Sequence, residues 1–324
     1  MAAGDVMTGA AALMAGDYIT LRRGLGYRSR VSERYLRAFA RYLDRAGHDG
    51  PIPLELSLDW AASTASADPC NPARRLTAVR GFLRHLSALD GATEVPAPGL
   101  LGPTGHRKPP HVHSDREISD LLRAAARLAP AGGLRPHCYA TLFGLLACTG
   151  LRISEALSLA CEDVDLTGGG MLTVRAGKRG RMRLVPLHPS SLAPLRDYGA
   201  HRRLRYGPPG DGDAFFRTDR SDHVSYNAAG STFTVLRRQL GWTAAGRTRA
   251  PRIHDLRHRM VVRRIQAWHA HGADVDHKIA VLATYLGHAQ VTDVYWYMSA
   301  VPELMSIVAG RFEAFAECPP AGIR

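Results

Sequence analysis

The sequence predicts a mainly α-helical protein of two domains, with a small antiparallel β-hairpin in the second domain. Over most of the chain, apolar residues recur every three or four positions, which is the period of helices that bury one face. One short stretch alternates with a period of two, as strands do. Between residues 91 and 113 the pattern collapses into a run rich in proline and glycine, which predicts an inter-domain linker.

The first domain is expected over residues 13–92, and the small, weakly patterned residues 1–12 are expected to be disordered. Two helical patterns stand out, and Asn71 followed by proline favours a helix start for the second. Arginines form a stripe beside each apolar face. Such stripes are commonly solvated faces. Two of them with almost no interleaved acid make contact with the DNA backbone an equally good interpretation for Arg30, Arg34, Arg37, Arg41, Arg74, Arg75, Arg80 and Arg84.

The linker, residues 93–113, carries cations and histidines of its own. Arg107 and Lys108 could lie along a phosphate backbone. His111 and His113 suggest metal binding at first sight, but two histidines without further ligands are far more often ordinary surface residues. We therefore expect no metal site and no cofactor.

The second domain is expected over residues 114–317, before a short tail at 318–324. Ser114 and Glu117 form a capping-box pattern, so a helix begins there, and helical patterns continue to about residue 160. The hairpin is predicted from two alternating segments around a basic turn, and Pro186 suggests that its strand lies at an edge. A long loop is expected within residues 199–230, followed by mostly helical patterns over residues 231–317.

The formal charge of +13 comes almost entirely from arginine. Arginine presents a planar fork of donors that matches phosphate oxygens and stays protonated near neutral pH. A protein from a GC-rich genome would use Arg in place of Lys, but that does not explain the sign of the net charge. The composition therefore favours a nucleic acid as partner.

The cysteines and the lack of long apolar segments indicate in which cellular compartment the protein is expected. The five cysteines contain no C-x-x-C pair, and their odd number argues against a disulfide framework. The start lacks a basic region followed by an apolar stretch, and no segment reaches the length of a membrane span. We expect a cytoplasmic, nucleoid-associated protein.

Two arginines lie in short sequence motifs that suit the binding of phosphate oxygens. Arg152 stands in T-G-L-R-I-S-E-A-L at a predicted helix start, where free backbone N–H groups favour an anion, and Glu155 could orient a neighbouring Arg or His. Arg257 follows His254 by three residues in H-D-L-R-H, so both share one helix face. Two guanidinium groups can hold phosphate oxygens and stabilise the negative charge of a phosphoryl transition state. An isolated arginine is more often part of a surface salt bridge, so the evidence lies in the combination.

Histidines, cations of the hairpin turn and a pair of tyrosines complete the set. His254 titrates near neutral pH and suits proton exchange. The turn offers Lys178, Arg179 and Arg181, any of which it could carry into a site on another element. A tyrosine phenol, with a pKa near 10, becomes nucleophilic when nearby cations stabilise its oxyanion. The candidates are Tyr297, nine residues after the histidine of L-G-H, and Tyr295.

The order and wording of these motifs resemble the tyrosine recombinase (phage integrase-like) family over residues 110–315. The Y-W-Y-M-S ending is similar to transposon- or plasmid-borne integrases. The resemblance implies a helical core-binding domain and an α+β catalytic domain. It implies a general-acid role for Lys178, favours Tyr297 as nucleophile and makes His288 a hydrogen-bond donor to phosphate. The implied catalytic set is Arg152, Lys178, His254, Arg257, His288 and Tyr297, with Glu155 in support and Arg179 and Arg181 contacting DNA.

The implied activity is site-specific DNA recombination or integration through a 3′-phosphotyrosyl intermediate, without metal or ATP. Double-stranded DNA would be bound by two protomers at each site and by four in synapsis, with a second recombinase as a further candidate partner. The helix expected after Pro302 could dock in cis or on an adjacent protomer. Two alternatives stay open: a type IB topoisomerase-like relaxing enzyme and an inactive DNA-binding regulator. A metal-dependent nuclease is disfavoured, because the motifs supply cations and no carboxylate cluster.

Overall fold

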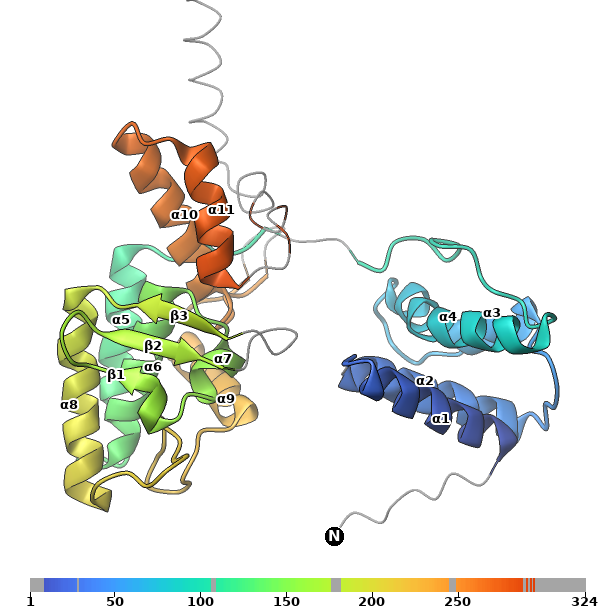
Figure 1. Ribbon diagram of the computed structural model, residues 1–324, viewed down its shortest axis with the longest axis horizontal. Helices are drawn as coiled ribbons and strands as arrows, with labels where there is room; N and C mark the ends of the chain where they lie inside the picture. Colours follow the sequence, from blue (N-terminus) through green and yellow to red (C-terminus); the bar gives the residue numbers. More distant parts are fainter. Residues whose placement is uncertain are drawn as a thin grey trace, which may run out of the picture. The chain divides into compact units, whose positions relative to one another are not determined.

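The computed structural model describes residues 9–27, 29–105, 109–175, 182–244, 249–287, 290, 292 and 294. The chain divides into two compact units, Met1–Arg107 and Lys108–Arg324 (Figure 1). The described part of the first unit is helical, whereas the second combines helices with a small sheet. None of the described helices is both long and apolar enough to cross a lipid bilayer.

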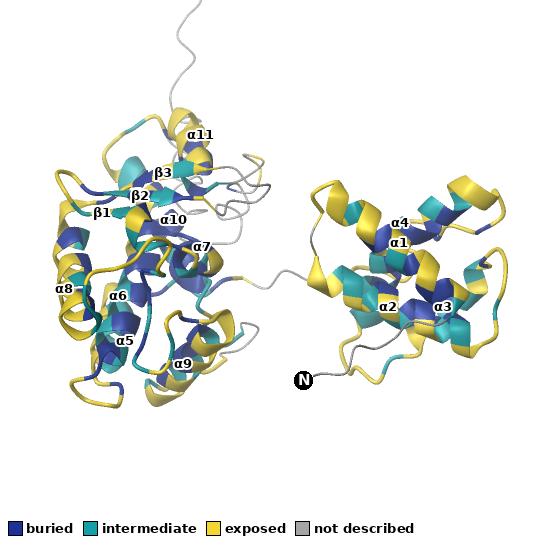
Figure 2. Ribbon diagram, turned by 60° about the horizontal axis from the view of Figure 1, so that its bottom comes forward, coloured by how far each residue is buried: buried dark blue, intermediate teal, exposed yellow. Residues whose placement is uncertain are grey.

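The first unit contains the helices α1 (Ala10–Gly24), α2 (Arg30–Arg45), α3 (Leu54–Ala62) and α4 (Asn71–Asp90). Their buried faces turn toward one another around a shared core (Figure 2). In this core Phe39 of α2 lies against Trp60 of α3, with ring centroids 4.9 Å apart. Burying a side chain of this size stabilises the fold by roughly 1.5–3 kcal/mol.

The two helical patterns predicted in this unit correspond to α2 and α4, and α4 begins at Asn71 as expected. The structure differs from the disordered start expected over residues 1–12. Helix α1 begins at Ala10 and buries Ala11 and Ala12. Alanine is the best helix former, but its small side chain contributes little to a hydrophobic period, so the sequence pattern did not reveal this turn.

The second unit has the element order α5 (Asp115–Ala126), α6 (Leu134–Thr149), α7 (Ile153–Leu157), η1 (Cys161–Asp163), β1 (Val164–Asp165), β2 (Met171–Val174), β3 (Arg183–Pro186), α8 (Pro189–Tyr206), α9 (Tyr226–Gln239), α10 (Asp255–Ala270) and α11 (Val275–Leu286). Helix α6 packs against α5, α8 and α10 and is the centre of the unit. Its Leu142 and Phe143 are fully buried in the larger core. A second cluster joins α10 to α11 through Val261, Ile265 and Ile279.

The sheet is antiparallel with the strand order β1-β2-β3. The predicted hairpin is confirmed as β2 and β3, whose register pairs Val174 with Arg183 next to the turn. Pro186 lies on β3, which is an edge strand, as expected. The two-residue strand β1 was not predicted, because so short a segment shows no measurable alternation. The mainly helical fold class with a small antiparallel sheet is confirmed.

The long loop expected within residues 199–230 is confirmed as the segment between α8 and α9, residues 207–225. Helix α8 continues to Tyr206, and α9 begins at Tyr226. The last turns of α8 are held by tertiary contacts: Arg202 is buried and bonds to Asp213 at 3.2 Å. The glycine and proline residues that break the helix begin only at Gly207, which follows as its C-cap.

Candidate active site

The turn between α6 and α7 places Arg152. Helix α6 ends at Gly150 in the left-handed conformation, with φ of 66°, which favours glycine. A side chain at Gly150 would also approach Met260 and Leu286, because its Cβ would lie 3.2 Å from the Met260 sulfur. Arg152 is then the N-cap residue of α7, as the T-G-L-R motif predicted.

The Glu155 carboxylate fixes the orientation of two arginines. It accepts hydrogen bonds from Arg152 Nη1 at 2.8 Å and from the Arg152 backbone N–H at 3.0 Å. It also accepts two bonds from Arg183, at 3.1 and 2.8 Å. The Glu155 side chain is only 2% exposed. Burial by itself raises its pKa, but these hydrogen bonds and charges outweigh burial and hold the pKa below its usual range, so the carboxylate is ionised.

The C-terminal end of α11 brings Arg152 and Arg257 together. Arg257 is 2% exposed, and its two η nitrogens donate to the carbonyl oxygens of Gly150 at 2.6 Å and Leu286 at 2.9 Å. Arg152 donates to the same Leu286 carbonyl at 3.5 Å and to the Gly287 carbonyl at 3.1 Å. Carbonyl groups at a helix C-terminus carry partial negative charge and favour guanidinium groups.

His254 lies beside this pair at the start of α10. Burial, together with the charges of Arg257, Arg252 and Arg152, lowers its pKa to about 4, so the ring is neutral at pH 7 and, contrary to the expectation, does not titrate near neutral pH. Its neighbour His258 is buried with its ring edge-on to His254, at a centroid distance of 4.8 Å. His254 is therefore a neutral proton carrier next to two fixed cations.

Several predicted residues lie outside the described residues: Arg107, Lys108, Lys178, Arg179, Arg181, His288, Tyr295 and Tyr297. Two of these segments are the hairpin turn and the segment that begins at His288. The described residues next to them contact the group formed by Arg152, Glu155 and Arg257. Arg183, the first residue of β3, donates from Nε to the Tyr285 carbonyl at 2.9 Å. Leu286 and Gly287, which precede His288, supply the acceptors for Arg152.

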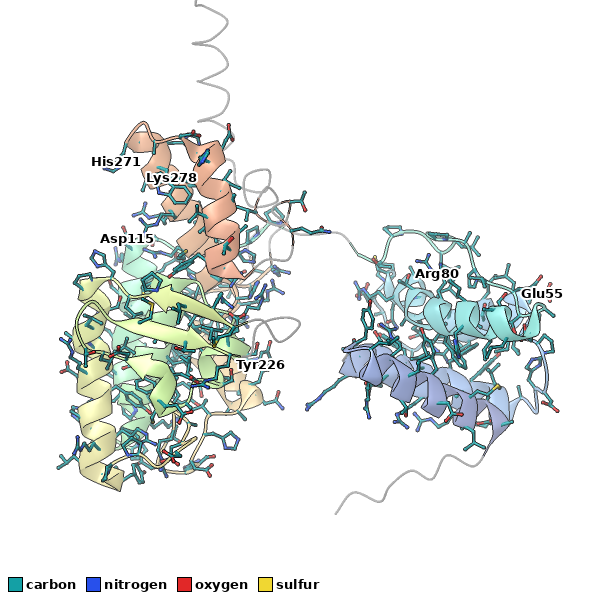
Figure 3. All side chains as sticks on the ribbon, in the orientation of Figure 1. Glu55, Arg80, Asp115, Tyr226, His271 and Lys278 are labelled. Carbon is teal, nitrogen blue, oxygen red and sulfur yellow. The ribbon has the colours of Figure 1, made fainter. Side chains whose placement is uncertain are left out.

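The arginines predicted to contact DNA differ in their surroundings. Arg30, Arg34, Arg37, Arg41 and Arg84 are exposed, and Arg80 on α4 is half-buried (Figure 3). Arg74 bonds to Asp68 and to the Thr104 carbonyl, and Arg75 lies over the Trp60 ring at 4.2 Å. The exposed arginines are therefore better placed for DNA than Arg74 and Arg75.

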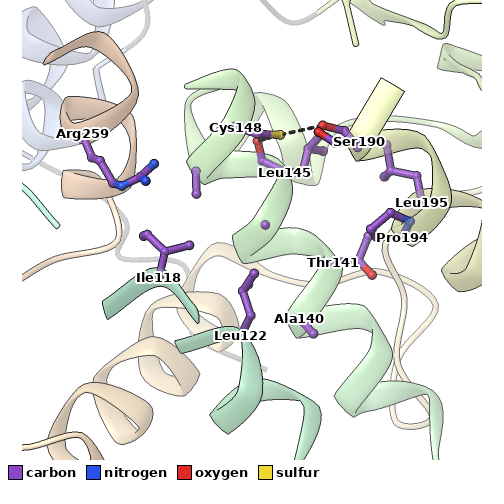
Figure 4. A pocket seen from close by; sticks show the side chains of 13 residues that line it. Ile118, Leu122, Ala140, Thr141, Leu145, Cys148, Ser190, Pro194, Leu195 and Arg259 are labelled. Atoms are coloured by element: carbon purple, nitrogen blue, oxygen red, sulfur yellow. Dashed lines mark hydrogen bonds between the residues drawn. The ribbon is translucent and has the colours of Figure 1, made fainter. Parts of the chain in front are cut away.

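The sequence pattern missed the role of Arg183. Arg183 was not among the predicted site residues, yet its side chain is 11% exposed and shares Glu155 with Arg152. Its position as the first residue of β3, directly after the basic turn, was the available signal. A separate apolar pocket between α5, α6 and α8 has, among the described residues that line it, none of the predicted catalytic ones (Figure 4). Cys148 in its wall accepts a hydrogen bond from Ser191.

A family model and curated relatives match more than half of this chain. Residues 114–303 match the phage integrase family. The chain is 38% identical over 301 residues to y4rB of Sinorhizobium fredii, named as an integrase/recombinase, which covers 92% of this chain and 95% of that protein. It is 30% identical over 310 residues to the tyrosine recombinase XerD of Mycobacterium tuberculosis, covering 91% of this chain and 94% of XerD.

A solved structure supports the fold. The XerH site-specific recombinase, bound to a palindromic difH substrate in a post-cleavage complex, matches with a TM-score of 0.63 and 16% identity, over 92% of this chain and 85% of XerH. The family match covers more than half of the 324 residues and includes Arg152, His254 and Arg257. This chain therefore belongs to the phage integrase family and is a tyrosine-type DNA recombinase.

Proposed function

We propose that the protein is a site-specific recombinase or integrase that cleaves and rejoins DNA strands through a 3′-phosphotyrosyl intermediate, without metal or ATP. The observation that carries this proposal is that Arg152 and Arg257 both donate hydrogen bonds to the carbonyl oxygen of Leu286. Two guanidinium groups fixed in this way present positive charge without needing to reorganise when a phosphate arrives.

The two arginines have different parts in this mechanism. The Arg152 side chain is 28% exposed and contacts the phosphate oxygens. Arg257 is buried, so it supplies a fixed positive charge and holds the Gly150 turn against the end of α11. Glu155 balances part of the charge and keeps Arg152 from swinging away. His288, from the segment after Gly287, donates a further hydrogen bond to the phosphate.

The chemical step is an in-line attack of the Tyr297 oxygen on phosphorus. The Tyr297 proton passes to a neighbouring base, and we propose His254, whose ring is unprotonated at pH 7 and able to accept it. Lys178 gives its proton to the leaving 5′ oxygen. A P–O bond to tyrosine forms as the P–O5′ bond breaks, so a free 5′ hydroxyl of another strand can reverse the step and join new partners.

The assembly we propose is two protomers on each recombination site and four in the synaptic complex. The palindromic substrate of XerH supports a two-fold arrangement, because a symmetric site presents the same surface to two copies. A second recombinase as partner would fit the same two-fold arrangement, with one of the two proteins on each half-site.

The decisive experiment uses a nicked suicide substrate in the presence of EDTA. Wild type is expected to form a covalent protein–DNA adduct, and Tyr297→Phe is expected to bind the DNA without forming it. Tyr295→Phe is the matched control and should retain the adduct. If Tyr295→Phe loses the adduct and Tyr297→Phe keeps it, the nucleophile is Tyr295.

The same assay separates the other activities. Supercoil relaxation without a recombinant product would identify a topoisomerase-like enzyme. DNA binding with no adduct in wild type would identify an inactive regulator. An adduct that forms only when EDTA is omitted would contradict the metal-free mechanism.

A further inference from the structure

Three side chains with metal-ligand chemistry converge where the second unit begins. One ring nitrogen each from His111 and His113 and one carboxylate oxygen from Glu117 all lie within 4.8 Å of one another. His111 Nε2 is 2.8 Å and His113 Nδ1 is 3.9 Å from the same oxygen, Glu117 Oε1. The burial of His113 corrects the expectation that this histidine is an ordinary surface residue, and the third side chain of the cluster comes from the helix that follows.

His113 is a buried member of this group whose ring nitrogens form no hydrogen bond with a described residue. It is 1% exposed, and its ring packs against Trp242 at 4.9 Å and against His111 at 4.6 Å. A buried polar group without a partner is rare in native proteins and often marks a bound water or ion.

The capping box at the start of α5 orients the Glu117 carboxylate toward the rings of His111 and His113. Glu117 is the third residue of the helix, and its Oε2 accepts the Ser114 backbone N–H at 2.7 Å in the capping box. The Ser114 hydroxyl accepts the Glu117 N–H at 3.1 Å in return. This reciprocal pair fixes the carboxylate and leaves Oε1 directed at the histidines. A hydrogen bond that orients a ligating carboxylate from behind is typical of protein metal sites.

The donor set and spacing suit a zinc-class ion. Two imidazoles and one carboxylate form a known type of zinc site, with metal–ligand distances of about 2.0–2.2 Å. Tetrahedral geometry at those distances separates neighbouring ligand atoms by roughly 3.4 Å. The two separations from Glu117 are 2.8 and 3.9 Å, and all three atoms lie within 4.8 Å, so small side-chain shifts would bring them to that spacing. The Glu117 side chain is 24% and that of His111 34% exposed, so water can reach a fourth position.

Charge around the cluster is balanced. Arg259 lies close enough to lower the pKa of His113, and its positive charge opposes cation binding. Asp115, which is labelled in Figure 3, pairs with both Arg259 and Arg263 and offsets that charge. The ionised Glu117 then supplies a local negative charge for the ion.

We propose that His111 Nε2, His113 Nδ1 and Glu117 Oε1 bind one divalent zinc-class ion, with water as the fourth ligand. The ion fastens residues 111–117 to α10. The His113 carbonyl accepts from Arg259 Nε at 3.0 Å, and Val112 packs on the cluster formed by α10 and α11. Since α10 begins beside His254 and carries Arg257, the ion steadies the helix that presents the active-site residues and takes no part in strand cleavage.

The test is metal binding by the full-length protein after removal of metals with a chelator. Zinc is titrated by competition with a chromophoric chelator, and Co²⁺ serves as a spectroscopic probe. We expect one ion per chain and a Co²⁺ visible spectrum without a thiolate charge-transfer band. His111→Gln and Glu117→Gln should each weaken binding by at least about tenfold. His271→Gln, an exposed histidine on the same unit, is the control and should bind as wild type does.

Thermal unfolding provides a second measurement. Zinc at a hundredfold excess over its Kd should raise the Tm of wild type and of His271→Gln by roughly 5 °C. It should leave the two ligand variants unchanged, while both still form the covalent DNA adduct. Absence of stoichiometric binding at micromolar zinc, or equal binding in wild type and both ligand variants, would overturn the proposal. Neither result would affect the proposed strand-cleavage activity.

Discussion

Glu155 holds Arg183 with both of its carboxylate oxygens, although the two residues are 28 positions apart. The same carboxylate accepts from Arg152, so a single buried acid joins the α7 start to the hairpin. Because Arg183 also donates to the Tyr285 carbonyl, the end of α11 belongs to the same network. This network fixes the distance between the motif that carries Arg152 and the strand that follows the basic turn.

Replacing Glu155 by Gln should destabilise the protein strongly. The substitution keeps the size of the side chain but leaves Arg183, which is 11% exposed, without its counter-charge. Removing one partner of a buried ion pair costs about 3–5 kcal/mol. Urea unfolding at pH 7 measures the change, and Glu162→Gln is the control, because Glu162 faces the exposed Arg175 at 3.6 Å. A surface pair of that kind contributes less than about 1 kcal/mol.

The effect of Glu155→Gln should also depend on pH. The pKa of Glu155 is held below its usual range, so its contribution is present at neutral pH and is lost as the pH falls through that lowered pKa. The difference between wild type and Glu155→Gln in free energy of unfolding should therefore shrink in acid. A difference that stays constant down to pH 3 would mean that the charge of Glu155 is not what stabilises the network.

Replacing Arg152 by Lys should slow strand cleavage far more than it weakens DNA binding. Lysine retains the positive charge but loses the planar fork that reaches the phosphate and the carbonyl of Gly287 together. Loss of one fixed donor to a transition state typically costs about 10²–10³ in rate. Single-turnover adduct formation measures the rate. Arg196→Lys on α8, where a guanidinium also donates to a backbone carbonyl, is the matched control and should cleave normally.

Acid should destabilise the fold through His258. Burial, with the charge of neighbouring groups, lowers its pKa to about 3, so the folded protein keeps this ring neutral while the unfolded chain protonates it near pH 6.5. The unfolded state then binds more protons, and stability falls as the pH drops from about 6.5 toward 3, by at most about 1.4 kcal/mol per pH unit. His258→Gln should flatten that part of the stability curve. His188→Gln, at an exposed position, should leave the slope unchanged.

DNA binding should depend steeply on salt, and the α2 arginines should account for part of the slope. Each phosphate contact contributes about 0.9 to the slope of log K against log salt. Arg34→Gln and Arg41→Gln, on the exposed stripe, should each reduce the slope by about that amount on any DNA sequence. Arg238→Gln, which is exposed on α9, should leave it unchanged. Equal slopes for all variants would place the DNA on another face.

Local interactions explain what the sequence by itself determined. The Ser114 capping box, the Asn71 helix start, the hairpin and the edge position of Pro186 are set within a few residues by hydrogen-bonding groups and hydrophobic period. The helix start at Arg152 belongs with them, because Gly150 provides the left-handed turn that precedes it. The motifs therefore identified their own secondary structure and the chemistry of their side chains.

Only the tertiary structure decided which groups meet. The Leu286 carbonyl oxygen accepts hydrogen bonds from Arg152, which is 134 positions away in the sequence, and from Arg257, which is 29 positions away. Every residue has a backbone carbonyl, so the sequence does not show which of them will accept such bonds. The sharing of Glu155 by Arg183, and the convergence of Glu117 on His111 and buried His113, likewise follow from the packing of whole elements. Such contacts depend on burial and long-range geometry, whereas a sequence pattern records only what lies on one face of one element.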